Sequence, residues 1–343
     1  MPLYLPHFNL QNYNTLASPV AAQFFVSVSS QPELLEAIAF AQERHLPLLV
    51  LGGGSNIVLR DDFPGLAIHM NLQGRELVAE DEEFIYVRAA AGENWHGFVE
   101  HCLACHYWGL ENLSLIPGSV GAAPIQNIGA YGVELADVFS ELTAINIESG
   151  LAVTFVKDSC QFNYRDSVFK GALKDKYIIT SVVFKLYKQL RLVLEYPALQ
   201  QALQGYATED IDAPLVSELV CRIRQSKLPE PKQIPNVGSF FKNPVVSAAT
   251  LSLIRQSHPS IVSYPAPAGE VKLAAGWLID RAGWKGRSHQ GVAVHSEQAL
   301  VLTNPNKLKG QALLDLAREI EESVFALFGV RLEMEPRVYP KLA

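Results

Sequence analysis

The feature that most constrains this chain is a run of three glycines at 52–54, followed by Ser55 and Asn56. An apolar segment of buried-strand type, 47–51, comes directly before the run, and segment 23–46 has the patterns of a strand and then a helix. Consecutive backbone N–H groups in such a loop can approach an anion closely. The segment therefore predicts a strand–helix–strand unit that ends in an anion-binding loop.

This loop differs from the two familiar phosphate-binding motifs. No lysine follows the glycines, as a Walker A loop requires, and residues 56–59 continue as a strand instead of the helix of a Rossmann fingerprint. A second long segment of small residues and hydrogen-bond donors, with almost no charge, spans 113–132. Two such loops suit a dinucleotide, with amides for the pyrophosphate and apolar atoms for the rings. The missing Rossmann motif favours FAD over NAD.

The remaining periodicity indicates an α+β protein in two or three layers. Alternating apolar residues predict strands and a hairpin at 84–89, 142–147, 151–156 and 178–186. Helical spacing predicts helices at 95–106, 215–225, 247–255 and 308–328, the last capped by Gly329. Ser30 and Glu33 predict a capping box at the start of the first helix. The proline-rich stretch 229–235 predicts a linker between domains.

Length and charge exclude several classes of function. The chain has 343 residues and a formal net charge of −7, with no basic run, which argues against nucleic acid or an anionic membrane as a partner. Its apolar stretches are all too short to cross a bilayer. The first Lys or Arg is Arg44, so no secretory signal is expected. We therefore expect a cytoplasmic protein of about two domains.

Two of the four cysteines, Cys102 and Cys105, are flanked by His101 and His106. Four such side chains are possible metal or redox ligands. Ligands from one helical turn cannot easily surround a tetrahedral ion, and no second pair of this spacing exists. The sequence favours a helix that carries two small apolar thiols, and it predicts no metal site.

Three further polar segments, 163–167, 236–244 and 332–337, are each weak signals alone. In combination with the glycine-rich loops they resemble the UDP-N-acetylenolpyruvoylglucosamine reductase family. The segments that carry this resemblance occur in the family's order, and they are 52–56, 109–113, 116–121, 126–132, 164–167, 238–244 and 273–280.

The resemblance implies a fold and a domain division. The expected fold is the vanillyl-alcohol-oxidase-like FAD-binding fold, made of two α+β subdomains, with a C-terminal α/β substrate domain. The FAD-binding region would cover residues 1–228, with subdomains at about 1–72 and 73–228. The substrate domain would cover 229–330, and a tail, 331–343, would return to the active site.

The resemblance also implies an activity and its chemistry. NADPH would reduce a non-covalent FAD and leave, and an enolpyruvyl ether of UDP-N-acetylglucosamine would then be reduced to UDP-N-acetylmuramate for peptidoglycan. By position in the family pattern, Arg165 and Glu335 would stabilise the enolate and Ser239 would donate a proton. Glu335 would help only when protonated, and burial against Phe240 and Phe241 is the expected cause of a raised pKa.

Further site residues follow from the same resemblance. The implied substrate-binding residues are Tyr164, Tyr196, Arg224, Lys227 and Asn243. The implied cofactor-binding residues are Gly52, Gly53, Gly54, Ser55, Asn56, Pro117, Gly118, Ser119, Gly121, Gln126, Asn127, Gly129, Ala130 and Tyr131.

Some positions depart from the family pattern. Ser288 stands where the family usually has a Gln that contacts the nucleotide, and Gln290 is a possible substitute. In the tail, Glu335 is preferred over Glu333 because it keeps the family's two-residue spacing to Arg337. Two other readings stay open: a different FAD enzyme of the same fold, such as a sugar or alcohol oxidase, and a nucleotide-sugar binding protein without activity.

Overall fold

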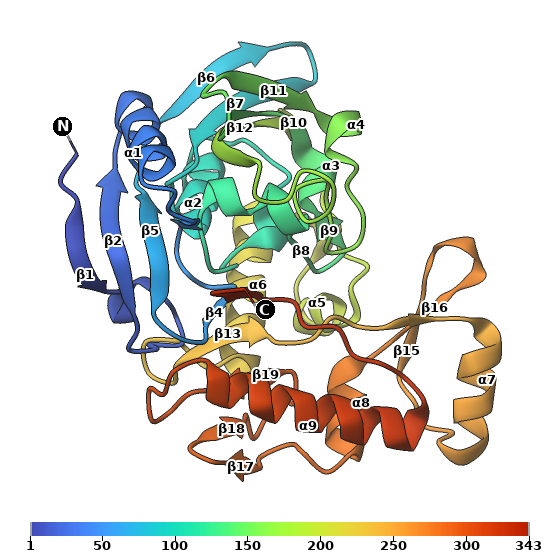
Figure 1. Cartoon of the computed structure of the whole chain (residues 1–343). Coiled ribbons are helices and arrows are strands. Elements are labelled where there is room, and N and C mark those ends of the chain that lie inside the picture. Colours follow the sequence, from blue (N-terminus) through green and yellow to red (C-terminus); the bar gives the residue numbers. More distant parts are fainter. Residues whose placement is uncertain (1, 342–343) are drawn as a thin grey trace. The chain divides into compact units, whose positions relative to one another are not determined.

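A computed structural model describes residues 2–341, which divide into two compact units (Figure 1). The first unit contains the described residues up to Phe8, together with Ala22–Gly53 and Pro64–Ser226. The second contains Asn9–Ala21, Gly54–Phe63 and the described residues from Lys227 onward. The chain thus passes between the units several times before residue 64.

A four-stranded sheet begins the first unit, in the order β1-β2-β5-β3. Its elements and the helix that follows β2 are β1 (Leu5–Asn9), β2 (Ala21–Val28), α1 (Gln31–Glu43), β3 (Leu48–Leu51) and β5 (Phe63–Met70). The predicted strand–helix–strand unit is confirmed. The capping box is half correct, because the Ser30 side chain accepts from the Glu33 N–H while the Glu33 carboxylate accepts from Ser29 instead of Ser30.

The second sheet of this unit is antiparallel, in the order β11-β10-β12-β7-β6. Its strands are β6 (Arg75–Glu80), β7 (Phe84–Ala90), β10 (Phe139–Asn146), β11 (Ala152–Val156) and β12 (Tyr177–Tyr187). The predicted hairpin is confirmed, with Ile145 opposite Ala152. Rings of Trp95, Phe98 and Phe184 pack together in the core beneath this sheet.

Shorter elements complete the first unit. Its other helices are α2 (Trp95–Ala104), α3 (Leu135–Val138), α4 (Lys157–Cys160), α5 (Pro197–Ala202) and α6 (Ala213–Lys227), whose last residue lies in the second unit. A two-stranded ribbon is formed by β8 (Gly129–Ala130) and β9 (Val133–Glu134). Single 3₁₀ turns span Glu111–Leu113, Val120–Ala122, Pro124–Gln126 and Thr208–Asp210.

Helix α2 ends at Ala104, two residues earlier than the pattern predicts, so its two cysteines differ in environment. Cys102 is buried in the core, and burial raises the pKa of its thiol. Cys105 follows the helix end and is half-buried, with its Sγ 3.9 Å from Nε2 of His101. Among residues 2–341, no group of three or more His, Cys, Asp or Glu side chains is arranged to hold a metal ion.

The described residues of the second unit form helices, two small sheets and a separate pair of strands. The sheets have the orders β13-β19-β18-β17 and β14-β16-β15. Their strands are β13 (Asn236–Ser239), β14 (Val245–Val246), β15 (Ser263–Pro265), β16 (Val271–Leu273), β17 (Ser288–His289), β18 (Val292–Val294) and β19 (Val301–Thr303). The helices are α7 (Ala248–Ser257), α8 (Ala275–Arg281) and α9 (Gln311–Phe328), with 3₁₀ turns at Gln11–Tyr13 and Pro267–Gly269.

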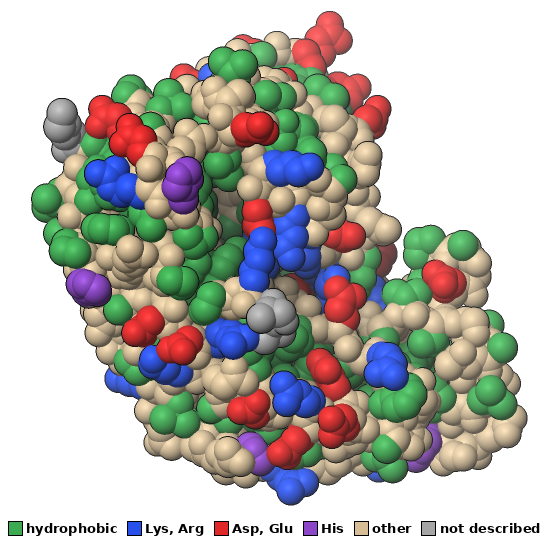
Figure 2. Space-filling model, in the orientation of Figure 1, with side chains coloured by type: hydrophobic (Ala, Val, Ile, Leu, Met, Phe, Trp, Pro, Cys, Tyr) green, Lys and Arg blue, Asp and Glu red, His purple; other side chains and the backbone are tan. Residues whose placement is uncertain are grey.

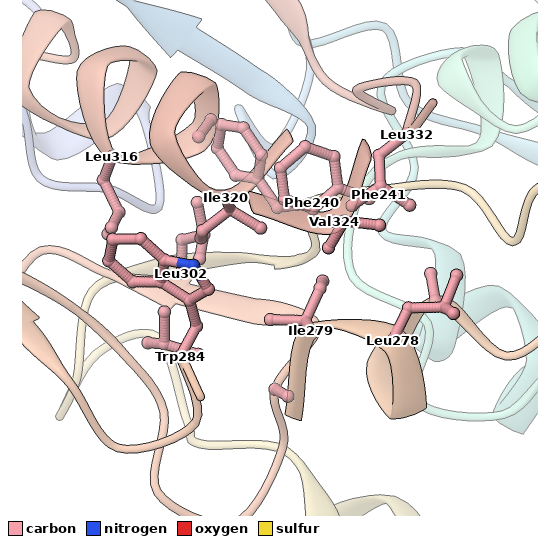
Figure 3. Packing of buried hydrophobic residues seen from close by; sticks show 14 of the residues in the cluster. Phe240, Phe241, Leu278, Ile279, Trp284, Leu302, Leu316, Ile320, Val324 and Leu332 are labelled. Atoms are coloured by element: carbon pink, nitrogen blue, oxygen red, sulfur yellow. The ribbon is translucent and has the colours of Figure 1, made fainter. Parts of the chain in front are cut away.

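The core of this unit lies between α8, α9 and the strands (Figure 3). Helix α9 contributes Leu316, Ile320 and Val324 from one face, as its spacing predicts, and Gly329 ends it in a left-handed conformation with φ +65°. Two strands from opposite ends of the chain, β4 (Ile57–Leu59) and β20 (Arg337–Tyr339), pair in parallel.

The division into compact units follows backbone contacts and cuts across the predicted functional domains. Residues 9–21 and 54–63 belong to the second unit, although both lie before residue 228. The bounds 1–228, 229–330 and 331–343 therefore stay a prediction about function.

In the part of the chain that the structure describes, no helix is long and apolar enough to cross a membrane. Figure 2 shows acidic and basic side chains interspersed over one face.

Asn304 offers a test of the second unit's packing. Its buried side chain donates to the carbonyls of Leu16 at 2.9 Å and Leu308 at 2.8 Å, and it accepts from the Leu308 N–H at 2.8 Å. Asn304→Ala leaves these groups without their partner, so we expect the free energy of unfolding to fall by about 2–4 kcal/mol in chemical denaturation.

The matched control is Asn306→Ala, which removes an exposed side chain that donates to one carbonyl, that of Gly291. We expect it to cost less than about 1 kcal/mol. Equal losses for the two variants would contradict a special role for Asn304.

Candidate functional site

Two small-residue loops that are far apart in the sequence meet in the first unit. An added Cβ at Gly52 would lie 2.1 Å from Oγ of Ser119, and one at Gly53 would lie 3.1 Å from Cα of Gly118. Gly118 also has φ +123°, a conformation that L residues rarely adopt. We call Gly52, Gly53, Gly118 and Ser119, all of them predicted cofactor-binding residues, the cofactor cradle. Side chains at Gly52 and Gly53 would occupy the room that the second loop takes.

Backbone hydrogen bonds hold the second loop against the segment that leads into α2. The N–H of Trp95 donates to Gly118 at 3.1 Å, and the N–H groups of Val120 and Gly121 donate to Glu93 and Ala91 at 2.9 Å. A Cβ at Gly121 would lie 2.5 Å from that of Ala91. Gly121 is therefore required by this close packing, whatever else it contacts.

The other half of the glycine loop, Gly54 to Asn56, belongs to the second unit. Gly54 has φ +60°, and a Cβ there would lie 2.1 Å from the carbonyl oxygen of Tyr13. The Asn56 carbonyl accepts from the N–H of Arg337 at 3.1 Å, at the start of the β4–β20 pair. The tail thus fixes the backbone at this end of the loop.

Asn127 connects the second loop to the turn that carries Arg165. Its side chain donates to the Glu134 carboxylate at 2.7 Å and to the Asn163 carbonyl at 3.1 Å, and it accepts from the Ala136 N–H at 3.0 Å. It is almost fully buried. The structure therefore gives Asn127 a positioning role within the protein, in addition to the predicted contact with a cofactor.

Arg165 lies against the same loop. Its Nη2 donates to the Gly129 carbonyl at 2.5 Å, and its guanidinium lies 5.3 Å from the centre of the Tyr164 ring. Arg165 itself has φ +52°, and Lys170 donates to its carbonyl at 3.3 Å. Gly129 and Arg165, predicted from two separate segments, are thus neighbours in the first unit.

A second group of predicted residues forms around Tyr131. Its ring packs edge-on against Tyr196, with centroids 5.1 Å apart. Asn112, which is buried, donates to the carbonyls of Tyr131 and Val193, both at 2.8 Å. It therefore ties the two tyrosine segments together. Asn112 lies in the segment 109–113, which carries the family resemblance, but no role for it follows from the sequence. Its partners, Tyr131 and Val193, lie on distant segments.

Arg224 of α6 joins this group. Its Nε donates to the carbonyl of Leu115 at 3.2 Å. Burial lowers the pKa of Arg224, and the positive charge of Arg165 acts in the same direction, while Tyr131 and Cys221 act against it. Two guanidinium groups close enough to influence each other suit a ligand with several negative charges.

Ser239 and Glu335 lie on neighbouring segments of the second unit. Ser239 ends β13, and the next residue, Phe240, accepts a hydrogen bond from the Glu335 N–H at 2.9 Å. The Lys242 N–H donates to Glu333, also at 2.9 Å, so the tail runs antiparallel to the segment after Ser239. The structure therefore brings together two of the three predicted catalytic residues within one unit.

The two phenylalanines after Ser239 point into the core (Figure 3). Both side chains are almost fully buried, and their rings pack edge to face, with centroids 5.4 Å apart. Burial of the Glu335 carboxyl group against these rings stays a prediction. The two phenylalanine side chains anchor this segment in the core. They thereby fix the backbone position of Ser239, which directly precedes them.

The remaining predicted residues have varied surroundings. Asn243 accepts from the Ala275 N–H at 2.9 Å, at the start of α8. Lys227 is the exposed last residue of α6, and Ser288 is exposed in β17. Glu333 pairs with Lys242 through an Nζ–Oε1 contact of 2.5 Å. The role of Glu335 as the reactive carboxyl group of the tail stays a prediction.

Comparison with known proteins agrees with this geometry. Residues 22–155 match the model of an FAD binding domain, and residues 230–339 match the C-terminal domain of UDP-N-acetylenolpyruvoylglucosamine reductase. A crystal structure of the reductase from Thermus caldophilus covers 99% of both chains with a TM-score of 0.68 and 23% identity. These matches confirm the predicted fold class, an FAD-binding fold followed by a C-terminal domain.

Curated relatives extend the match in sequence. The UDP-N-acetylenolpyruvoylglucosamine reductase of Pseudomonas putida is 47% identical over 331 residues, which is 96% of this chain and 97% of the relative. That of Pseudomonas aeruginosa is 46% identical over 333 residues, 97% of this chain and 98% of the relative. Since the similarity extends along nearly the whole of both chains, this chain belongs to the UDP-N-acetylenolpyruvoylglucosamine reductase family.

Proposed function

We propose that this protein reduces the enolpyruvyl ether of UDP-N-acetylglucosamine to UDP-N-acetylmuramate, a precursor of peptidoglycan, in the cytoplasm. FAD would be bound non-covalently and NADPH would be the reductant. The observation that carries the proposal is the near-full-length identity to curated reductases. Two further observations support it: within the second unit the segments of Ser239 and Glu335 are hydrogen-bonded neighbours, and within the first unit Arg165 and Arg224 supply positive charge for an anionic substrate.

The residues present fit FAD. Within the cofactor cradle, the two loops approach each other along bare backbone, so N–H groups can reach a pyrophosphate that side chains would exclude. Residues 54–56 and 126–131 would complete the site. When bound, the flavin supplies hydride chemistry that no side chain of the protein provides.

The substrate is an anion with a diphosphate and a carboxylate. Arg165 and Arg224 would neutralise that charge, and Tyr196, which is 41% exposed, would donate to a phosphate oxygen. Tyr164, Lys227 and the amide N–H₂ of Asn243, whose oxygen accepts from Ala275, are proposed to complete substrate binding. Each of the two guanidinium groups would attract the anion, so both should contribute to its affinity.

The reaction needs a stabilised negative charge and a proton. Addition of hydride to the terminal vinyl carbon leaves an electron pair spread over the neighbouring carbon and the carboxylate. Arg165 would stabilise that charge, and Glu335 would add a hydrogen bond in its protonated form. The Ser239 hydroxyl would then donate its proton to the neighbouring carbon, which completes the reduction of the double bond.

Turnover distinguishes this function from that of an oxidase of the same fold. We expect the purified protein to be yellow and to oxidise one NADPH per enolpyruvyl substrate consumed when oxygen is excluded. The measurement is NADPH absorbance together with chromatography of the product. Rapid oxidation of a sugar or alcohol by oxygen, with no consumption of the enolpyruvyl substrate, would support the oxidase instead.

Gly53→Val tests the cofactor cradle. A branched side chain would meet the Gly118 backbone, so we expect the variant to be isolated as colourless apoprotein that does not regain FAD on soaking. The measurement is flavin absorbance after purification. Gly171→Ala is the control, since a Cβ there would have its nearest neighbour 4.0 Å away and the variant should stay yellow. A yellow Gly53→Val variant would place FAD elsewhere.

Ser239→Ala tests the proton donor. The change removes the hydroxyl at almost constant volume, so folding and FAD content should persist. In stopped-flow experiments, we expect reduction of the enzyme by NADPH at the parental rate. Reoxidation by the enolpyruvyl substrate should slow by roughly 10²–10⁴-fold, as for the loss of a general acid.

Ser239→Cys provides the matched control, because its thiol still carries a transferable proton. It should recover part of the reoxidation rate. The assignment is wrong if Ser239→Ala reoxidises at the parental rate with saturating substrate.

A further inference from the structure

Leu115, two residues before Pro117 in the second loop, has a backbone conformation unusual for its side chain. Its φ is +58°, in the left-handed region where a Cβ clashes with the backbone. The residue lies between the buried 3₁₀ turn Glu111–Leu113 and the cofactor cradle. A turn held in this conformation determines the direction in which residues 117–119 leave it.

Side chains from two helices hold both polar groups of Leu115. Its N–H donates to Nδ1 of His96, in the first turn of α2, at 3.1 Å. Its carbonyl accepts from Nε of Arg224, in α6, at 3.2 Å. Neither bond belongs to regular secondary structure, so each helix contributes a specific contact to a single residue of the loop.

The acceptor role of Nδ1 defines the state of His96. An imidazole nitrogen that accepts a hydrogen bond carries no proton, so in neutral His96 the proton is on Nε2. That nitrogen lies 3.6 Å from a carboxylate oxygen of Glu100, on the same helix, and 4.0 Å from Sγ of Cys221, on α6. These neighbours orient the ring so that Nδ1 faces the loop.

Further contacts of the same two helices surround this bond. The indole Nε1 of Trp95 donates to the Leu113 carbonyl at 2.8 Å, and the hydroxyls of Ser114 and Ser217 lie 2.7 Å apart. Residues 113–115 are thus fixed from α2 and α6, and Trp95 also bonds Gly118 inside the cofactor cradle. Among these contacts, only the one from His96 satisfies the N–H of the left-handed residue.

We propose that His96 is a positioning residue for cofactor binding: its Nδ1 holds Leu115 in the left-handed conformation and so presents residues 117–119 to the FAD pyrophosphate. This inference rests on the proposed role of the cofactor cradle. The inference adds His96, a residue that would contact neither cofactor nor substrate. His96 would act by setting the direction of the loop.

Two substitutions at His96 separate the two ring nitrogens. His96→Asn places an amide oxygen near the position of Nδ1, whereas His96→Gln reaches the position of Nε2 and leaves the Leu115 N–H without its acceptor. We expect FAD affinity to fall roughly 5- to 100-fold in His96→Gln. In His96→Asn it should stay within about threefold of the parent. The measurement is titration of apoprotein with FAD, followed by flavin fluorescence.

Two substitutions at Leu115 test the same bond from the loop. Leu115→Val favours extended backbone and should weaken FAD binding, while Leu115→Gly adopts positive φ without a steric penalty. In the His96→Gln background, Leu115→Gly should therefore recover most of the lost affinity. His101→Gln, in the last turn of α2, is the control and should bind FAD like the parent. Thermal unfolding of each apoprotein checks that the fold is retained.

The outcomes separate this inference from the proposed function. If His96→Gln and Leu115→Val bind FAD as tightly as the parent while Gly53→Val does not bind it, the cofactor cradle stands and the role of His96 is wrong. If Gly53→Val also binds FAD normally, the cradle is wrong and the inference fails with it. Loss of affinity in His96→Gln without recovery by Leu115→Gly would likewise overturn the role of the left-handed turn.

Discussion

The close approach of two backbones at Gly53 and Gly118 is the constraint on which the first unit's site depends. An added Cβ at Gly53 would lie 3.1 Å from Cα of Gly118, so a side chain at Gly53 would force the two segments apart. Three features position the segment that contains Gly118: the hydrogen bond from Trp95, the packing at Gly121 and the contacts around Leu115. A site of this kind is built from backbone, and its side chains mostly hold that backbone in place.

Several buried or half-buried asparagine side chains form hydrogen bonds within the protein, including two that the sequence predicts to bind ligands. Asn127 makes three hydrogen bonds to neighbouring segments, and Asn243 accepts from the first residue of α8. Asn112 links the segments of Tyr131 and Val193. Such amides fix loops that have no regular hydrogen bonding, because each satisfies one or more backbone groups.

Local features of the fold could be predicted from the sequence, because they depend on spacing within one segment. The hairpin at 142–156, the helix ended by Gly329 and the strand after Asn56 are of this kind. Spacing within one segment could not predict that Phe240 and Phe241 turn into the core, because their direction is set by packing against α8 and α9. It also missed Asn112 and His96, whose partners lie on distant segments.

Position along the chain also has a consequence for synthesis. Strand β4 pairs with β20, whose residues lie near the far end of the sequence, and the Asn56 carbonyl accepts from the Arg337 N–H. At about 5–20 residues per second, a ribosome produces β20 on the order of tens of seconds after β4. During that interval the strand edge at 57–59 has no partner from the tail, while much of the first unit is already complete. In a nascent chain the pairing of β4 is therefore among the last backbone contacts to form, after the rest of the sequence has been made.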